Sequence, residues 1–271
     1  SGTGLDEFCE MFPERLFDVG IAEQHALTMA AGMACEGLRP VVAIYSTFLQ
    51  RAYDQLLHDI ALQRLHVVIC IDRAGIVGED GETHQGIYDL ALLLTIPEIV
   101  ILSPRNYREL KNMMEYAIYK CSGPVAIRYP RGKEQFFDSN PDSTYTVCDE
   151  IIPERITAGD DITVIAEGAM VETGYDLSRR LQIEGYSCDM FDIRKIKPLY
   201  DIDIIESIKR TTRVMVLENA IISSGLGCMI ESLLLEKNIN AKIVKIGVKD
   251  HILKHGSVDE LYLLEEMDKN S

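Results

Sequence analysis

The feature that most constrains the fold is an alternation, from Phe17 onward, of short runs rich in β-branched residues with longer amphipathic stretches. Parallel strands are usually joined by a crossover helix, so this alternation is typical of an α/β fold. In the first half of the chain we expect strands at Leu16–Val19, Val41–Tyr45, Val67–Ile71, Ile99–Leu102 and Val125–Arg128. Helices are expected near Glu23–Glu36, Phe48–Gln63 and Tyr107–Lys120.

A break in this alternation after Arg131 predicts a boundary between two domains. Residues 132–143 are rich in turn formers and polar side chains. Beyond them the pattern resumes, with strands expected at Ile162–Ala166, Tyr186–Asp192, Val214–Glu218 and Ala241–Ile246 and helices near Ala169–Glu184 and Leu226–Glu236. The length of 271 residues suits two domains. We place these at 1–138 and 157–271, with a linker at 139–156.

Charge and cysteine usage restrict the partners. The 27 Lys and Arg against 43 Asp and Glu give a net charge of −16, which repels nucleic acids and anionic lipid surfaces. No apolar run approaches the ~20 residues that cross a bilayer. The seven cysteines are scattered and form no C-x-x-C pair. We therefore expect no nucleic-acid or membrane partner, and a reducing, cytoplasmic location.

Two segments place unusual side chains where a predicted strand ends and a helix begins. Glu23 follows a turn and opens a helix, and Tyr45 precedes Phe48 and Arg51. Open α/β sheets bind ligands at the carboxyl ends of their strands. A structural interpretation stays open for each residue, because a first-turn glutamate complements the helix dipole and aromatic side chains are common in cores.

The next strand runs into a loop of unusual composition. Residues 73–86 hold four glycines together with Arg73, Asp80 and His84. Glycine-rich loops are often plain turns, but a loop so dense in charged groups rarely serves packing alone. Three successive strand ends of this kind predict one site at the edge of the first sheet.

Taken together, these segments resemble a known family. Similarity to the 1-deoxy-D-xylulose 5-phosphate synthases, thiamine diphosphate enzymes of the transketolase group, is carried by Phe17–Ala26, Ala43–Gln55, Ile71–Gly78, Thr83–Gly86 and Ile127–Gly132. The second domain resembles the transketolase C-terminal domain more loosely. The resemblance implies two doubly wound α/β domains, a pyrimidine-binding domain and a transketolase C-terminal-like domain.

For the cofactor, the resemblance implies that Glu23 binds a ring nitrogen of the aminopyrimidine of thiamine diphosphate. A hydrogen bond there favours the imino tautomer, whose exocyclic nitrogen can take the thiazolium proton and generate the nucleophilic carbanion. Glu23 should therefore be shielded from water. Phe48 would stack on the pyrimidine, with Tyr45 and Arg51 close by.

For the substrates, the resemblance implies pyruvate, which loses carbon dioxide, and glyceraldehyde 3-phosphate as the acceptor. Arg73 and Arg131 match arginines that would hold the acceptor's phosphate, which a planar guanidinium suits. Asp80 and His84 would contact the acceptor's hydroxyls and aldehyde oxygen or relay a proton there, and Tyr45 would border the same substrate. The implied catalytic residues are Glu23, Asp80 and His84.

The sequence departs from the family in what it lacks. We find neither the Gly-Asp-Gly segment and downstream Asn that hold Mg²⁺ and the diphosphate, nor the first strand of the pyrimidine-binding domain. We therefore expect a two-domain piece with no metal site of its own, inactive alone, and a homodimer through the helices near Glu23–Glu36 and Phe48–Gln63. Alternatives are the C-terminal half of a split transketolase, a pyruvate dehydrogenase beta subunit, or a dimerising module without activity.

One further turn offers backbone amides to an anion. Ser223–Gly227 follows the predicted strand Val214–Glu218 and precedes a helix, but it lacks the full dinucleotide fingerprint. A tight packing turn is the structural alternative.

Overall fold

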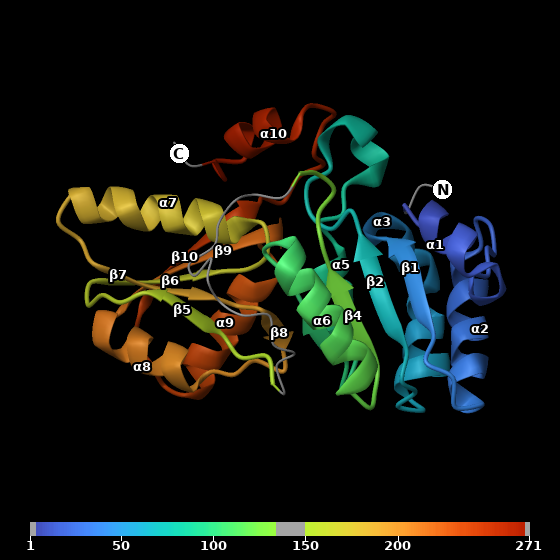
Figure 1. Cartoon of the computed structure of the whole chain (residues 1–271). Helices are drawn as coiled ribbons and strands as arrows, with labels where there is room; N and C mark the ends of the chain where they lie inside the picture. The colour runs from blue at the N-terminus through green and yellow to red at the C-terminus, as the bar shows by residue number, and fades with distance from the viewer. Residues whose placement is uncertain (1–3, 134–149, 269–271) are drawn as a thin grey trace.

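The computed structural model describes residues 4–133 and 150–268, which form two β-sheets lying side by side with helices packed on them (Figure 1). The first sheet has the order β1-β2-β4-β3-β8, parallel except for its last strand. Its strands are β1 (Val41–Tyr45), β2 (Val68–Asp72), β4 (Val125–Arg128), β3 (Val100–Leu102) and β8 (Lys195–Lys197). Around it lie α2 (Glu23–Cys35), α5 (Asp89–Leu94) and α6 (Tyr107–Tyr119).

The second sheet has the order β10-β9-β6-β7-β5, with an antiparallel edge strand, β5. Its strands are β10 (Lys242–Val248), β9 (Arg213–Ile221), β6 (Ile162–Ala166), β7 (Cys188–Asp192) and β5 (Glu154–Thr157). Helices α7 (Met170–Ile183), α8 (Ile202–Thr211) and α9 (Leu226–Glu236) cover it. The last helix, α10 (Val258–Leu264), begins with a capping box between Ser257 and Glu260. No described helix is long and apolar enough to cross a bilayer.

The first half of the chain contains several further short helical elements. They are α1 (Asp6–Met11), η1 (Pro13–Arg15), α3 (Ser46–Leu49), η2 (Gln50–Ala52), α4 (Tyr53–Gln55), η3 (Leu56–Ala61), η4 (Gly78–Asp80) and η5 (Glu82–His84). The inner strands of the first sheet are buried along most of their length, which is why they are continuous apolar runs rather than alternating ones.

Much of the predicted element pattern is confirmed. β1, β4, β6 and α9 have the expected bounds, and α2, α6 and α7 differ from theirs by no more than one residue at either end. The pattern did not indicate α8, β5 or the three-residue β8, which comes from the second half of the chain and completes the first sheet. Of the expected linker, residues 139–149 lie outside the described residues and residues 154–156 belong to β5.

One expected strand is wrong, and one expected helix is present in a different form. Residues 16–19 form no strand: they are irregular, and the Phe17 side chain is 59% exposed. The apolar run pairs with no described strand, and β-propensity needs such a neighbour to take effect. The helix expected at Phe48–Gln63 begins two residues earlier, at Ser46, and is broken into α3, η2, α4 and the π-helical η3.

Candidate active site

β1 and β2 end beside each other, and the residues at their ends form the first part of the site. Tyr45 of β1 is in register with Asp72 of β2. α3 begins directly after Tyr45, so that Phe48 stacks on the Tyr45 ring with centroids 5.7 Å apart and an interplanar angle of 14°. The guanidinium of Arg73 lies 3.8 Å from the centroid of the Tyr45 ring. The strand ends thus present an aromatic surface with a cation over one face.

Glu23 joins this surface from the first turn of α2. Its side chain is only 10% exposed, and Arg51 Nη1 donates a hydrogen bond to Glu23 Oε1 at 3.1 Å. The same guanidinium lies 4.8 Å from the centroid of the Phe48 ring. Arg51 therefore links the shielded carboxylate of Glu23 to the aromatic pair.

Asp80 lies between two arginines. Arg73 Nε donates to Asp80 Oδ2 at 3.1 Å, and Arg131 Nη1 donates to Asp80 Oδ1. Partial burial acts to raise the pKa of Asp80, but the hydrogen bonds from Arg131 and Arg73 outweigh it and lower that pKa below its ordinary value. Burial raises the pKa of Asp72 even though Arg73 pairs with it at 2.8 Å. At neutral pH Asp80 is therefore an anion that holds two guanidinium groups together.

His84 brings the glycine-rich loop onto the aromatic pair. Its ring meets Phe48 edge-on, with centroids 5.3 Å apart. The hydroxyl of Thr47 donates to the carbonyl of Thr83 at 3.1 Å and ties the loop to α3. The structure therefore brings all eight predicted site residues into one group, which we call the strand-end cluster: Glu23, Tyr45, Phe48, Arg51, Arg73, Asp80, His84 and Arg131.

The base of the loop is closed by glycines. Gly75 and Gly86 form an antiparallel bridge with hydrogen bonds of 2.7 and 2.8 Å. Gly86 lies so close to the Arg73 carbonyl and to Ser46 that a Cβ would not fit there. Close backbone approach, rather than flexibility, is thus the reason for a glycine at position 86.

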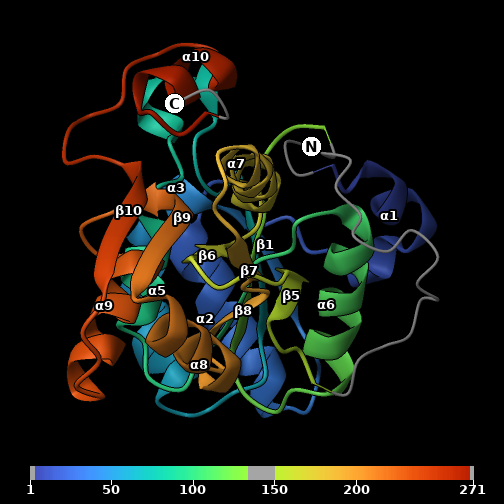
Figure 2. The same cartoon turned by 90° about the vertical axis from the view of Figure 1, so that its left-hand side faces the viewer.

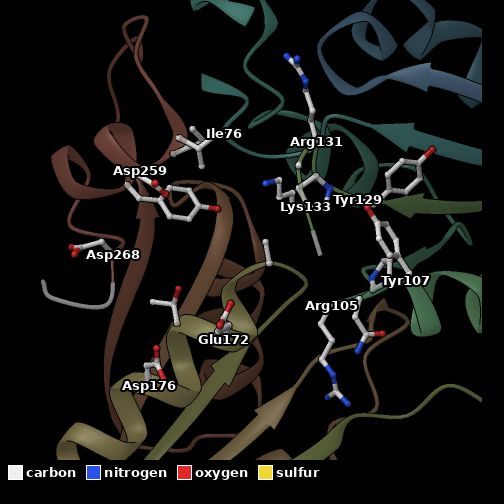
Figure 3. Close-up of a pocket in the computed structure, with 18 of the residues that line it drawn as sticks. Ile76, Arg105, Tyr107, Tyr129, Arg131, Lys133, Glu172, Asp176, Asp259 and Asp268 are labelled. Atoms are coloured by element: carbon white, nitrogen blue, oxygen red, sulfur yellow. The ribbon is translucent and has the colours of Figure 1, made fainter. Parts of the chain in front are cut away.

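A cavity of about 570 Å³ lies next to the cluster, between the starts of α6 and α7 and the helix α10 (Figure 3). Basic Arg131 and Lys133 line one side of it, and acidic Glu172, Asp176 and Asp259 line the other. Of the predicted site residues, Arg131 alone borders this cavity. Its walls come from both halves of the chain, so sequence motifs, each confined to one segment, could not predict this cavity.

Sequence patterns also missed two buried ionic groups between the sheets. Arg128 of β4 donates to Asp89 at 3.0 Å and to Glu167, beyond the end of β6, at 2.8 Å. Arg105, before α6, pairs with Asp192 of β7 at 2.8 Å and with Glu154 at 2.9 Å. Glu109, Glu154 and Asp192 are close enough together to hold a metal ion, but Arg105 is the cation among them. Each of these residues is unremarkable in its own segment.

The amides of the turn at Ser223–Gly227 bind an acidic side chain of the protein itself. The amides of Leu226 and Gly227 donate to the carboxylate of Glu218 at 2.6 and 3.0 Å. A Cβ at Gly225 or Gly227 would meet this carboxylate. Both interpretations of the turn therefore apply, because it packs tightly against the carboxyl group that its amides bind.

Two family descriptions match the chain. Residues 1–135 match "Transketolase, pyrimidine binding domain" and residues 154–271 match "Transketolase, C-terminal domain". Among curated relatives, the 1-deoxy-D-xylulose-5-phosphate synthase of Desulforudis audaxviator is 45% identical over 95% of this chain, and that of Caldanaerobacter subterraneus is 42% identical over 100% of it. The chain spans 40% and 43% of the length of these two relatives.

Solved structures give the same fold. A "split gene transketolase, inactive beta4 tetramer" superposes with a TM-score of 0.87 at 27% identity, covering 100% of this chain and 86% of that one. The transketolase of Campylobacter jejuni superposes with a TM-score of 0.71 at 16% identity, which concerns the fold alone. The chain therefore belongs to the transketolase family, with that family's pyrimidine-binding and C-terminal domains.

Proposed function

We propose that this chain is the part of a 1-deoxy-D-xylulose-5-phosphate synthase that binds the pyrimidine end of thiamine diphosphate and the phosphorylated acceptor. The complete enzyme would condense pyruvate with glyceraldehyde 3-phosphate and release carbon dioxide. The observation that carries this proposal is the strand-end cluster, where a shielded carboxylate, an aromatic pair and two convergent arginines meet at one sheet edge. The identity of 42–45% to synthases over nearly the whole chain supports it.

The cluster residues fit the pyrimidine end of the cofactor. Arg51 donates a hydrogen bond to Oε1 of Glu23, which leaves the other carboxylate oxygen to accept a hydrogen bond from a ring N–H. The stacked rings of Tyr45 and Phe48 offer a surface to a flat heterocycle. When bound, thiamine diphosphate supplies the nucleophilic carbon that takes up pyruvate. Glu23 would hold a proton at the pyrimidine nitrogen, and Mg²⁺ and the diphosphate would be bound by the additional sequence of the longer relatives.

The arginines fit the acceptor. Arg73 and Arg131 converge on the carboxylate of Asp80, so an anion of similar size already has its partners in place. A phosphate would take over part of these hydrogen bonds, since guanidinium groups bind phosphate and carboxylate with the same fork geometry. His84, at the edge of the Phe48 ring, would face the acceptor's aldehyde oxygen and move a proton there.

We expect the chain alone to be folded and catalytically silent. A cofactor held only at its pyrimidine end would lack the metal and diphosphate contacts that supply most of the charge-based affinity. Calorimetry with thiamine diphosphate and Mg²⁺, beside an assay for carbon dioxide release from pyruvate, measures both properties. Micromolar binding, or turnover by the chain by itself, would contradict the prediction.

A second candidate function is the C-terminal half of a split transketolase. The similar split-gene chain, which this chain covers to 86%, favours it. The donor substrate distinguishes the two candidates: a synthase consumes pyruvate and releases carbon dioxide, whereas a transketolase takes a two-carbon unit from a ketose phosphate. Assaying the enzyme with both donors decides between them. The higher identity to synthases leads us to prefer the first.

We further propose a cytoplasmic homodimer that supplies the precursor of isoprenoids and of thiamine. The dimer would form through α2 and the helical segment from α3 to η3. Just before α2 and just after η3, the apolar side chains of Ile21 and Leu62 are exposed. Sedimentation at tens of micromolar should give twice the mass of the chain. A monomer at that concentration would refute dimerisation through these two domains.

A further inference from the structure

The loop of residues 73–86 carries three residues of the strand-end cluster, yet the ends of this loop are buried in the second domain. Ile76 and Ile87, each 1% exposed, pack into an apolar core with Ala166 of β6, Leu217 of β9 and Leu261 of α10. α10 lies against the loop in both views of the molecule (Figures 1 and 2). The first domain supplies the loop, and the second domain provides much of its support.

Asn219 of β9, in the second domain, makes the polar contact at the start of the loop. The amide of Ile76 donates to Asn219 Oδ1 at 3.0 Å, and Asn219 Nδ2 donates to the hydroxyl of Tyr262 at 2.9 Å. Its backbone is fixed as well, because its N–H donates to Glu167 at 2.9 Å and its carbonyl accepts from Arg128 at 3.0 Å. With the side chain buried and both ends of the carboxamide bonded, the direction of the acceptor oxygen is set.

Strand β9 holds the loop at both of its ends. Gly75, with φ at +83°, lies directly against the carboxamide of Asn219, where a Cβ would not fit. Two residues after Asn219, the amide of Ile221 donates to the carbonyl of Ile87 at 3.1 Å. Between these anchors, the amide of Val77 donates to Gln85 Oε1 at 3.0 Å. Contacts from β9 therefore hold both ends of the segment that contains Asp80 and His84. The second domain also reaches its middle, where His255 Nε2 lies 3.3 Å from the carbonyl oxygen of Glu79.

We propose that Asn219 is a positioning residue through which the second domain sets the conformation of the 73–86 loop, and with it the placement of Asp80 and His84 against Arg131 and Phe48. Removing the carboxamide leaves the amide of Ile76 buried without a partner, so the loop base should loosen while the two sheets persist. The consequence for acceptor binding rests on the proposed function. The positioning itself rests on the contacts of Asn219 alone.

Amide hydrogen exchange of the 271-residue chain tests the positioning without reference to activity. Asn219→Ala should raise exchange of the amides of Ile76 and Val77 about tenfold, the loss expected for one buried hydrogen bond. Gly75→Ala places a methyl group against the carboxamide of Asn219 and should also raise the exchange of these two amides. Thr163→Val is the matched control, because it removes buried hydrogen bonds to Ser207 and Thr211 in the same domain, away from the loop.

The proposal would be overturned if Asn219→Ala and Gly75→Ala both left the exchange rates of the loop amides unchanged. It would also be overturned if Thr163→Val raised those rates by the same factor. If Asn219→Ala does not fold, Gly75→Ala and Tyr262→Phe decide, the latter by removing the hydroxyl that orients the carboxamide. In the complete enzyme, Asn219→Ala should raise the KM for glyceraldehyde 3-phosphate about tenfold and leave decarboxylation of pyruvate unchanged. A wild-type enzyme that does not turn over these substrates refutes the proposed function and leaves the exchange result standing.

Discussion

At the scale of single residues, the strand-end cluster separates into two groups with different tasks. Glu23 contacts Arg51 and lies by the aromatic pair, whereas Arg73 and Arg131 meet at Asp80. The two groups share no hydrogen bond among those described, and the rings of Tyr45 and Phe48 lie between them. Substitutions in one group should therefore leave the task of the other largely intact.

We predict that Glu23→Gln and Arg131→Ala give opposite kinetic defects in the complete enzyme. Glu23→Gln should slow exchange of the thiazolium proton and lower turnover even at saturating aldehyde, because an amide replaces the carboxylate that binds the pyrimidine N–H. Arg131→Ala or Arg73→Ala should raise the KM for glyceraldehyde 3-phosphate about tenfold to a hundredfold, since a charge-assisted contact is worth about 1.5–3 kcal/mol.

Steady-state kinetics with both substrates and NMR of the thiazolium proton measure these two effects. Arg64→Ala is a suitable control, because Arg64 forms an exposed ion pair with Glu98 and precedes β2, whereas Arg73 follows the other end of that strand. Normal acceptor KM in the Arg73 and Arg131 variants would mean that these arginines only pair with Asp80.

At the scale of one element, helix α9 has an unusual N-terminus. Gly225 makes no side-chain cap, and the first amides of the helix instead donate to Glu218 in the buried part of β9. Burial raises the pKa of Glu218 to about 7, although the amides of Gly227 and Leu226 act to lower it. The carboxyl group therefore titrates close to neutral pH in the folded chain.

The sign of the resulting pH dependence follows from this raised pKa. Between pH 4.5 and 7 the folded chain binds a proton at Glu218 that the unfolded chain has lost, so stability falls as the pH rises through this range. The free energy of unfolding should decrease by at most about 3 kcal/mol from this group over that pH range. We predict that Glu218→Gln removes this contribution to the decrease in the free energy of unfolding with pH. Glu184→Gln, at the exposed end of α7, should leave that decrease unchanged. Urea unfolding at pH 5 and pH 7.5 measures the difference, and parallel pH profiles of Glu218→Gln and wild type would contradict it.

At the scale of the whole molecule, the two sheets are joined by a shared interior. One apolar core contains Ile69 and Ile101 of the first sheet together with Ile165 and Val216 of the second. Arg128 crosses the same boundary, fully enclosed, between Asp89 and Glu167. The domains should therefore unfold together in one cooperative transition.

Arg128→Ala is predicted to lower the free energy of unfolding by about 3–5 kcal/mol, because it leaves two carboxylates buried without their counter-ion. Urea denaturation compares this loss with that of Arg64→Ala, for which an exposed pair predicts less than about 1 kcal/mol. If Arg128→Ala and Arg64→Ala lowered the free energy of unfolding by similar amounts, the buried ion pairs of Arg128 would contribute little more to stability than an exposed pair.

The sequence by itself determined the α/β class, the place of most strands and helices, and the grouping of Tyr45, Phe48 and Arg73, whereas Arg131 joined the predicted site only through the family resemblance. These are local properties: apolar periodicity over a few turns predicts each strand and helix, and parallel strands bring successive carboxyl ends to one edge. Tyr45, Phe48 and Arg73 could be grouped without coordinates because each follows its strand within a few residues. The false strand at Leu16–Val19 marks the limit, since an apolar run becomes a strand only beside a partner.

Only the tertiary structure decided which distant residues support the site. Asn219 lies 143 positions from Ile76, and Glu167 lies 39 from Arg128, so neither pairing leaves a local pattern. Lys195–Lys197 is too short to stand out as a strand, yet it completes the sheet of the other domain. A buried polar residue is satisfied by whichever groups the packed chain brings to it, and that depends on the whole fold rather than on its own segment.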